Sequence, residues 1–205
     1  MKLHSNRNSL RVFLAVELSL DLCRKVREFQ QQLQNFLPHV NWVRPESIHL
    51  TLKFLGNVDA SMVDQVLTAL EPIGKSQPPF TLEIQGLGVF PHVRRPRIFW
   101  IGCTGDIPAL LNLVSGVEGA LDPLEFPSEE KPYVPHLTLA RIKHDNSQVG
   151  KVLTHSGLLE QPQNLGILPV ARITLFRSNV TTIGVEYIPL WAVPLINEAV
   201  SNFSS

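Results

Sequence analysis

A short motif that occurs twice carries the side chains best suited to catalysis. The sequence HLTL at residues 49–52 recurs letter for letter at residues 136–139. In a β-strand the side chains at positions i and i+2 share a face, so each histidine points the same way as its threonine, and the leucines face the core. One copy alone is usually an exposed or hydrogen-bonded surface pair. Two copies favour function, because a duplicated fold can bring both strands to one cleft around a pseudo-twofold axis.

These side chains suit in-line displacement at phosphorus. An imidazole has an ordinary pKa of about 6.5, so one histidine can take a proton from attacking water while the other gives a proton to the departing oxygen. Threonine hydroxyls can donate hydrogen bonds to the non-bridging phosphate oxygens. The motif therefore predicts His49 and His136 as catalytic residues and Thr51 and Thr138 as substrate-binding residues. This chemistry requires no metal and no cofactor.

The elements that position the motifs follow from hydrophobic periodicity. Apolar runs and alternation predict strands, whereas apolar residues at steps of three and four predict helices, several of them bounded by Ser, Asp, Gly or Pro. Their order is not a strict βαβ alternation, which favours an α+β fold with antiparallel sheets. The predicted strands cover residues 11–18, 48–54, 80–90, 97–103, 136–142, 170–177 and 185–194, and the predicted helices cover 19–37, 59–75, 106–121 and 146–154.

Composition limits the class of protein. The chain has 205 residues, 44% of them hydrophobic, and its 18 Lys and Arg balance 18 Asp and Glu, which excludes charge-driven disorder and a uniformly basic surface. Cys23 and Cys103 have no metal-ligand spacing and suggest neither a disulfide framework nor a zinc site, which fits a reducing cytoplasm. No apolar run has the length of a membrane span. We take a monomer as the default oligomeric state. We expect a loose tail over 1–10 and one bilobal domain over 11–205.

The chain resembles the two-histidine phosphoesterases, and among them the bacterial and archaeal RNA 2′,3′-cyclic phosphodiesterases, also called LigT-like proteins or 2′-5′ RNA ligases. The resemblance extends over residues 11–195 and rests on the blocks RVFLAVEL, WVRPESIHLTLKFLG, RPRIFW and PHLTLAR. It implies a bilobal α+β fold with pseudo-twofold symmetry. Each lobe would be an antiparallel sheet backed by helices, and the active-site cleft would lie between the lobes.

The resemblance also implies the reaction and two further site residues. The substrate would be an RNA 3′ end that bears a 2′,3′-cyclic phosphate, or a small cyclic nucleotide, hydrolysed to a 2′-phosphate; 2′-5′ joining would be a side activity. Arg141 matches an arginine that contacts the phosphate, and Phe13 lies near the bound nucleotide. On an unbroken strand Arg141 would face away from His136, so its role requires a bulge or the end of the strand at Ala140. Phe13 could equally be a core residue.

Several alternatives stay open at this level. We assign His49 as the acid on O3′ and His136 as the base on water, but the near-symmetry of the site allows the reverse. Rival functions are cleavage of 2′-5′-linked oligonucleotides or small cyclic nucleotides, and a binding module without turnover. Lys53 could add charge to the cleft or lie on the surface. The loop with Arg94, Arg95 and Arg97 could bind RNA phosphates or be merely solvated. We expect Trp42 and Trp100 to pack within the protein rather than stack on bases, and Tyr133 to lie at the cleft rim.

Overall fold

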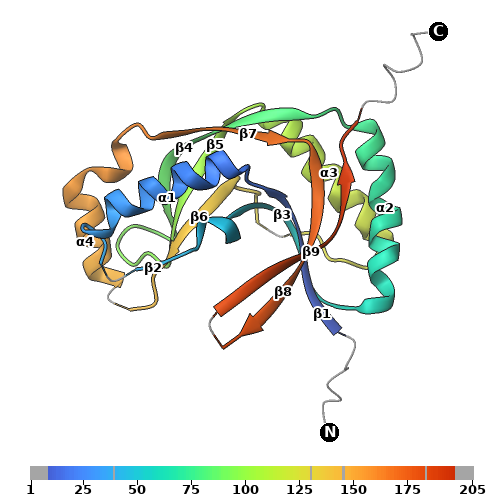
Figure 1. Cartoon of the computed structure of the whole chain (residues 1–205), viewed down its shortest axis with the longest axis horizontal. Coiled ribbons are helices and arrows are strands. Elements are labelled where there is room, and N and C mark those ends of the chain that lie inside the picture. The colour runs from blue at the N-terminus through green and yellow to red at the C-terminus, as the bar shows by residue number, and fades with distance from the viewer. Residues whose placement is uncertain (1–8, 39, 130, 145, 183, 197–205) are drawn as a thin grey trace, which may run out of the picture.

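One curved antiparallel sheet forms the framework of the molecule (Figure 1). The computed structural model describes residues 9–38, 40–129, 131–144, 146–182 and 184–196. Within them, the strands have the spatial order β7-β4-β5-β6-β3-β1-β8-β9, and the short β2 pairs with β6. The strands are β1 (Ser9–Glu17), β2 (Asn41–Trp42), β3 (His49–Asp59), β4 (Phe80–Phe90), β5 (Ile98–Gly105), β6 (His136–Arg141), β7 (Asn164–Val170), β8 (Arg172–Thr181) and β9 (Gly184–Pro194). The helices are α1 (Leu20–Gln34), α2 (Val63–Ser76), α3 (Ile107–Leu121) and α4 (Asn146–Ser156).

The sheet divides into two lobes at the junction of β3 and β6. The first lobe contains β3, β1, β8 and β9, with α2 and α3 packed against β9 and β3 (Figure 1). The second lobe contains β7, β4, β5 and β6, with α1 packed against β7 and α4 on the same side of the molecule as α1. Helix α1 follows β1 of the first lobe but packs against the second lobe. Helix α3 follows β5 of the second lobe but packs against the first lobe. Both lobes therefore use elements from both halves of the chain.

The two motif strands are neighbours in the middle of the sheet. β3 and β6 are antiparallel and meet at the pair Leu50 and Leu137, both fully buried. Away from this point β3 pairs with β1 and β6 pairs with β5, so the lobes diverge on either side of it. The histidine that precedes each of these leucines consequently lies next to the line along which the lobes join.

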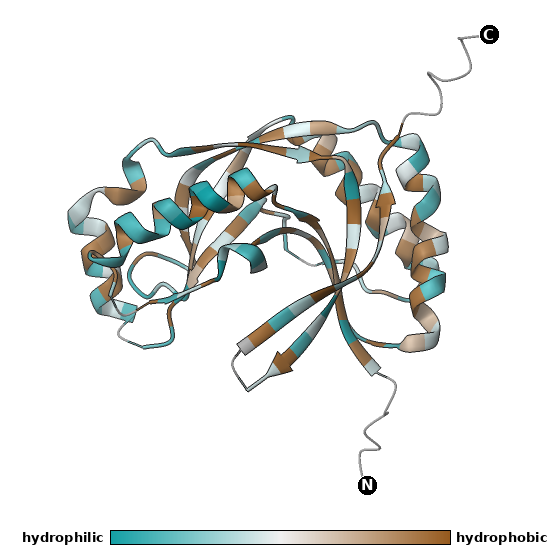
Figure 2. Cartoon of the chain, in the orientation of Figure 1, coloured by the Kyte–Doolittle hydropathy of each residue, from teal (hydrophilic) through white to brown (hydrophobic). Residues whose placement is uncertain are grey.

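The helices form where capping residues and apolar spacing predict them. The side chain of Ser19 accepts a hydrogen bond from the N–H of Leu22 at the start of α1, and Asp106 accepts one from the N–H of Ala109 at the start of α3. In α1 the hydrophobic residues interrupt an otherwise hydrophilic helix (Figure 2), and those at helical spacing are buried. None of the helices in the described ranges is long and apolar enough to cross a membrane.

Several element boundaries differ from the sequence prediction: β3 runs on to Asp59, α2 begins at Val63, and β8 covers Arg172–Thr181. The clearest differences are the start of β1 and the strand β7. β1 begins at Ser9, which pairs with Asp59, so residues 9 and 10 belong to the sheet and not to the expected tail; residues 1–8 lie outside the described residues. The strand β7 was not predicted, because Gly166 and Pro169 are residues that usually interrupt strands. β7 lies at the edge of the sheet and, among the described strands, pairs with β4 alone, which explains why a proline is tolerated there.

Candidate active site

A cleft of about 540 Å³ opens where β3 and β6 meet. It is lined by His49 and Thr51 from β3, and by His136, Thr138 and Arg141 from β6. In each motif the histidine and threonine are half-buried and the intervening leucine is buried, which is the alternation predicted for a strand. The two copies of the motif thus contribute four polar side chains to one cavity.

Both imidazoles are held by the same backbone contact. Nδ1 of His49 lies 2.9 Å from the carbonyl oxygen of Ser47, and Nδ1 of His136 lies 2.7 Å from that of Val134, two residues earlier in each case. A carbonyl oxygen can only accept, so Nδ1 carries the proton and donates in both rings. Each histidine is left with Nε2 as the ring nitrogen available for proton transfer.

Aromatic side chains fix the planes of both rings. The His49 ring lies 4.6 Å from that of Phe13 and 5.0 Å, edge-on, from that of Tyr187, measured between ring centroids. The His136 ring lies 5.0 Å, also edge-on, from that of Phe90 and 6.1 Å from that of Trp100. Phe13 is only 3% exposed, so it lines the cleft mainly as the support behind His49.

Gly88 makes room for the support of the second histidine. It pairs with Trp100 across β4 and β5, and a Cβ atom at residue 88 would lie 2.1 Å from the indole ring. The missing side chain lets the indole lie flat on β4, beside Phe90 and behind His136. Trp42 packs edge-on against the buried Phe99, so both tryptophans pack within the protein.

Burial controls the charge of His49. Loss of hydration lowers its pKa to about 4. The hydrogen bond to Ser47 acts in the opposite direction, and electrostatic repulsion from Arg141 and His136 lowers the pKa further. At neutral pH the ring is therefore neutral and can accept a proton at Nε2. A bound phosphate anion would act in the opposite direction and favour the protonated ring.

A bulge in β6 turns Arg141 toward the cleft. Thr138 pairs with Trp100 and Ala140 pairs with the adjacent Phe99, which leaves Leu139 as the extra residue. Leu139 and Ala140 are consequently both buried, and Arg141 emerges on the side of the cleft. For Arg141 to face the cleft with His136, strand alternation required a bulge or the end of the strand, and this bulge meets that requirement.

The same bulge occurs in β3 and corrects the interpretation of Lys53. Thr51 pairs with Ala15 and Lys53 with Leu14, so Leu52 is the extra residue. Lys53 is 2% exposed, and its Nζ lies 2.5 Å from Glu118 Oε2 of α3 and donates to the carbonyl of Pro127 at 2.7 Å. Both sequence interpretations, a cleft cation or a surface lysine, are wrong.

Other residues of the cleft lay outside the sequence prediction. The wall on the side of the first lobe includes Arg11 and Phe54, together with Val180, Val185 and Tyr187 from the β8–β9 hairpin. Phe54 is 62% exposed and follows His49 at the same spacing at which Arg141 follows His136. Comparison of the two motif copies could therefore have identified Phe54 as a cleft residue.

Tyr133 contacts the backbone of β3 from outside the cleft. Its hydroxyl donates to the carbonyl of Thr51 at 2.8 Å, and its ring packs against the core. It does not appear among the described residues that line the cavity, so the expected place at the rim is wrong. The contact ties the loop before β6 to the backbone of the first motif.

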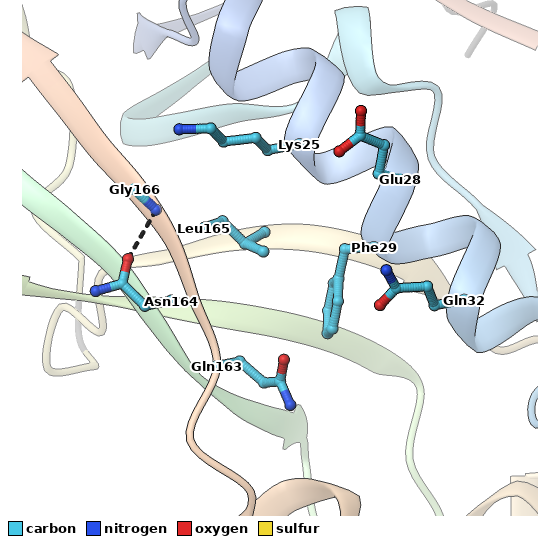
Figure 3. A pocket seen from close by; sticks show the side chains of 8 residues that line it. All are labelled: Lys25, Glu28, Phe29, Gln32, Gln163, Asn164, Leu165 and Gly166. Atoms are coloured by element: carbon cyan, nitrogen blue, oxygen red, sulfur yellow. Dashed lines mark hydrogen bonds between the residues drawn. The ribbon is translucent and has the colours of Figure 1, made fainter.

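A second hollow, of about 380 Å³, lies between α1 and β7 and carries little chemistry (Figure 3). Its charged groups are Lys25, which pairs with Asp21 at 2.9 Å, and Glu28, which pairs with Arg24 at 2.9 Å. Asn164 Oδ1 accepts from the N–H of Gly166. These groups already bind their own neighbours, so we assign no site there. Within the described ranges, no group of three or more His, Cys, Asp or Glu could hold a metal ion.

The fold and the paired motifs define a two-histidine phosphoesterase. The chain belongs to the family of LigT-like phosphoesterases, whose model matches residues 16–100 and again residues 101–187. The double match coincides with the internal repeat, because each segment contains one copy of the motif. The family and the two-lobed α+β fold expected from the sequence are thereby confirmed.

Several relatives of this chain share one name. The chain is 36% identical over 149 residues to the RNA 2′,3′-cyclic phosphodiesterase of Aquifex aeolicus, covering 71% of this chain and 77% of the relative. It is 32% identical over 182 residues to the protein of that name from Methanothermobacter thermautotrophicus, covering 87% and 95%. Among solved structures, the crystal structure of TT0787 of Thermus thermophilus superposes with a TM-score of 0.77 at 27% identity, covering 92% of this chain and 100% of that one.

Proposed function

We propose that this enzyme hydrolyses the 2′,3′-cyclic phosphate at the 3′ end of RNA to a 2′-phosphate without a metal ion. Water oxygen bonds to phosphorus, and the bond from phosphorus to O3′ breaks. One Nε2 takes the proton of water, and the other gives a proton to O3′. The observation that carries the proposal is that two imidazoles, each tied through Nδ1 to a backbone carbonyl, face one cleft with Nε2 available. The name shared by the relatives supports the choice of substrate.

The charges of the cleft suit an anionic substrate. Arg11 and Arg141 line it, and among the described lining residues there is no carboxylate. The hydroxyls of Thr51 and Thr138 donate to the non-bridging oxygens, and the guanidinium of Arg141 neutralises the charge of the phosphate. Phe13 acts on the nucleotide indirectly, by holding the ring of His49.

The two histidines have different roles in the proposal. His49 protonates O3′ and His136 accepts the proton of water. Because burial lowers the pKa of His49 to about 4, this order requires the bound phosphate to favour the protonated ring. A neutral His49 that activates water, with His136 as the acid, is the reverse order.

A substrate with sulfur in place of O3′ separates the two orders. A thiolate leaves without protonation, so loss of the general acid costs little with this substrate, whereas loss of the base costs as much as before. We expect His49→Asn to regain most of its rate with the sulfur substrate. Recovery by His136→Asn instead would reverse the roles.

The function itself is tested with a nucleoside 2′,3′-cyclic monophosphate in the presence of excess chelator. The proposal expects turnover to the 2′-phosphate and slower or no cleavage of a 2′-5′-linked dinucleotide. Tight binding without turnover would make the protein a binding module. Faster cleavage of the 2′-5′ linkage would make that linkage the substrate. Replacement of water by the 5′-hydroxyl of a second RNA gives the ligation side activity, which is measured as chelator-resistant formation of 2′-5′-linked product.

A further inference from the structure

A third depression, smaller than the active-site cleft, adjoins that cleft on the side of the second lobe. It has a volume of about 420 Å³ and is lined by Phe90, Pro91, His92, Arg95, Arg97 and Ile98, at the loop between β4 and β5. Ile98 lines both the depression and the cleft, and the ring of Phe90 contacts that of His136. A ligand long enough to pass Ile98 can therefore occupy the cleft and this loop depression together.

The loop depression is cationic. Its charged groups are the guanidinium groups of Arg95 and Arg97, with the imidazole of His92 beside them, and its described lining includes no carboxylate. Both arginines are exposed, and neither forms an ion pair with any residue in the described ranges. Two guanidinium groups without carboxylate partners have the donors and the geometry that bind phosphate oxygens.

The backbone that carries these side chains is fixed on several sides. The N–H of Arg97 donates to the carbonyl of Phe90 at 2.6 Å, and the carbonyl of Arg97 accepts from the N–H of Ile142 at 2.8 Å. Nδ2 of Asn146 donates to the carbonyl of Pro96 at 2.9 Å. Because the loop is already ordered, an anion bound by its arginines costs little further backbone entropy.

The chemistry of a cyclic end decides which phosphate can reach this loop. A 2′,3′-cyclic phosphate occupies both O2′ and O3′, so the rest of an RNA chain continues only through O5′ of the terminal ribose. The nearest other phosphate is therefore the one on O5′. Resting on the proposed function, we infer that Arg95 and Arg97 form a subsite for this 5′ phosphate. The subsite makes RNA ends, or nucleotides that carry a 5′ phosphate, better substrates than plain cyclic nucleosides.

A pair of substrates that differ by one phosphate tests the inference. One is a nucleoside 2′,3′-cyclic phosphate with a 5′-hydroxyl, and the other carries a 5′-phosphate. For the unmodified protein, kcat/KM should be about tenfold higher with the 5′-phosphate, as expected for hydrogen bonds to a charged group. The double variant Arg95→Ala/Arg97→Ala should lose this preference and keep its kcat/KM on the 5′-hydroxyl substrate within about twofold.

The chain offers a matched control in Arg94. It lies exposed in the same loop but does not line the depression, so Arg94→Ala removes one guanidinium charge from the loop and should leave kcat/KM on both substrates unchanged. Arg11, on the opposite wall of the cleft, provides the competing location. The inference is overturned if Arg11→Ala loses the preference for the 5′-phosphate substrate while Arg95→Ala/Arg97→Ala keeps it. That result would place the 5′ phosphate at the wall that carries Arg11.

Two further outcomes would also overturn it. One is an unmodified protein that treats the two substrates equally, and the other is a double variant that loses both activities to the same extent. In each case turnover of the 5′-hydroxyl substrate by the unmodified protein still upholds the proposed function. Failure to turn over either substrate rejects that function, and with it the subsite.

Discussion

Asparagine in place of either histidine should stop proton transfer and preserve the fold. In both rings Nδ1 donates to a backbone carbonyl, Ser47 for His49 and Val134 for His136, and Nε2 is the nitrogen that reacts. The Nδ2 of asparagine lies close to the position of Nδ1 and can donate to the same carbonyl. Asparagine has no counterpart of Nε2 and does not titrate. The substitution therefore separates the catalytic role of each histidine from its structural contact.

The size of the effect follows from the role of a general acid or base. Such a group usually contributes about 10²- to 10⁴-fold to the rate, or roughly 3–5 kcal/mol. Because His49 and His136 act in one displacement, the double variant should be little slower than the slower single variant. His49→Asn also loses ring contacts to Phe13 and Tyr187, at a cost of about 1 kcal/mol of unfolding free energy.

Steady-state kinetics and thermal unfolding together check this prediction. We expect kcat on a 2′,3′-cyclic mononucleotide to fall by about two to four orders of magnitude while KM changes little. The midpoint of unfolding should drop by only a few degrees. A folded variant of either position with full kcat would refute the two-histidine mechanism. Multiplicative losses in the double variant would show that the histidines act in separate steps.

Four other variants or conditions test other parts of the site. Activity should survive excess EDTA, with a bell-shaped pH dependence of kcat/KM that belongs to the histidine pair; a requirement for added metal would contradict this. Thr51→Val and Thr138→Val should each cost about 1.5–3 kcal/mol, roughly 10- to 150-fold in kcat/KM, and unchanged kinetics would remove that hydroxyl from the site. Because folding lowers the pKa of His49 to about 4, its contribution to stability is complete above pH 6.5 and is lost as the pH falls from 6.5 to 4. Urea unfolding should therefore show a steeper decline over that range for the unmodified protein than for His49→Asn, and equal slopes would exclude the shift. Lys53→Met should destabilise the fold by about 3 kcal/mol by leaving Glu118 without its partner, and Lys53→Met/Glu118→Leu should recover most of this. Equal stability of the single and double variants would show that the unpaired Glu118 is not the cause of the loss.

Local patterns predicted the elements that carry the site. Apolar alternation is a property of a few consecutive residues, so it located β3 and β6 and placed His49 beside Thr51 on one face. Helix boundaries were likewise visible, because Ser19 and Asp106 cap the helices through their own side chains. The repeated motif then indicated that two distant strands share a cleft. The strands and the helix caps depend on residues close together in the sequence, and the shared cleft was inferred from the repeat alone.

The parts that the sequence did not reveal depend on partners far along the chain. β7 contains Gly166 and Pro169, and only its position at the sheet edge makes a strand of those residues possible. The bulges at Leu52 and Leu139 appear only in the register with β1 and β5. Alternation alone therefore gave the wrong direction for Lys53. Tyr187 could not be found for the same reason, since the hairpin brings it to His49 from the far end of the chain.

The two motif strands are bulged at equivalent places, yet they deliver different side chains to the cleft. After its bulge β3 presents Phe54, whereas β6 presents Arg141, so a repeated backbone places a phenyl ring and a guanidinium at corresponding positions. The charge of Arg141 adds to burial in lowering the pKa of His49. Acid–base catalysis by two groups of the same type proceeds in the state in which one is neutral and the other protonated. Burial and Arg141 favour a neutral His49, so in the proposed order the bound phosphate must reverse this preference. The residues that distinguish the two histidines therefore include those just after the shared motif, where the two copies cease to be alike.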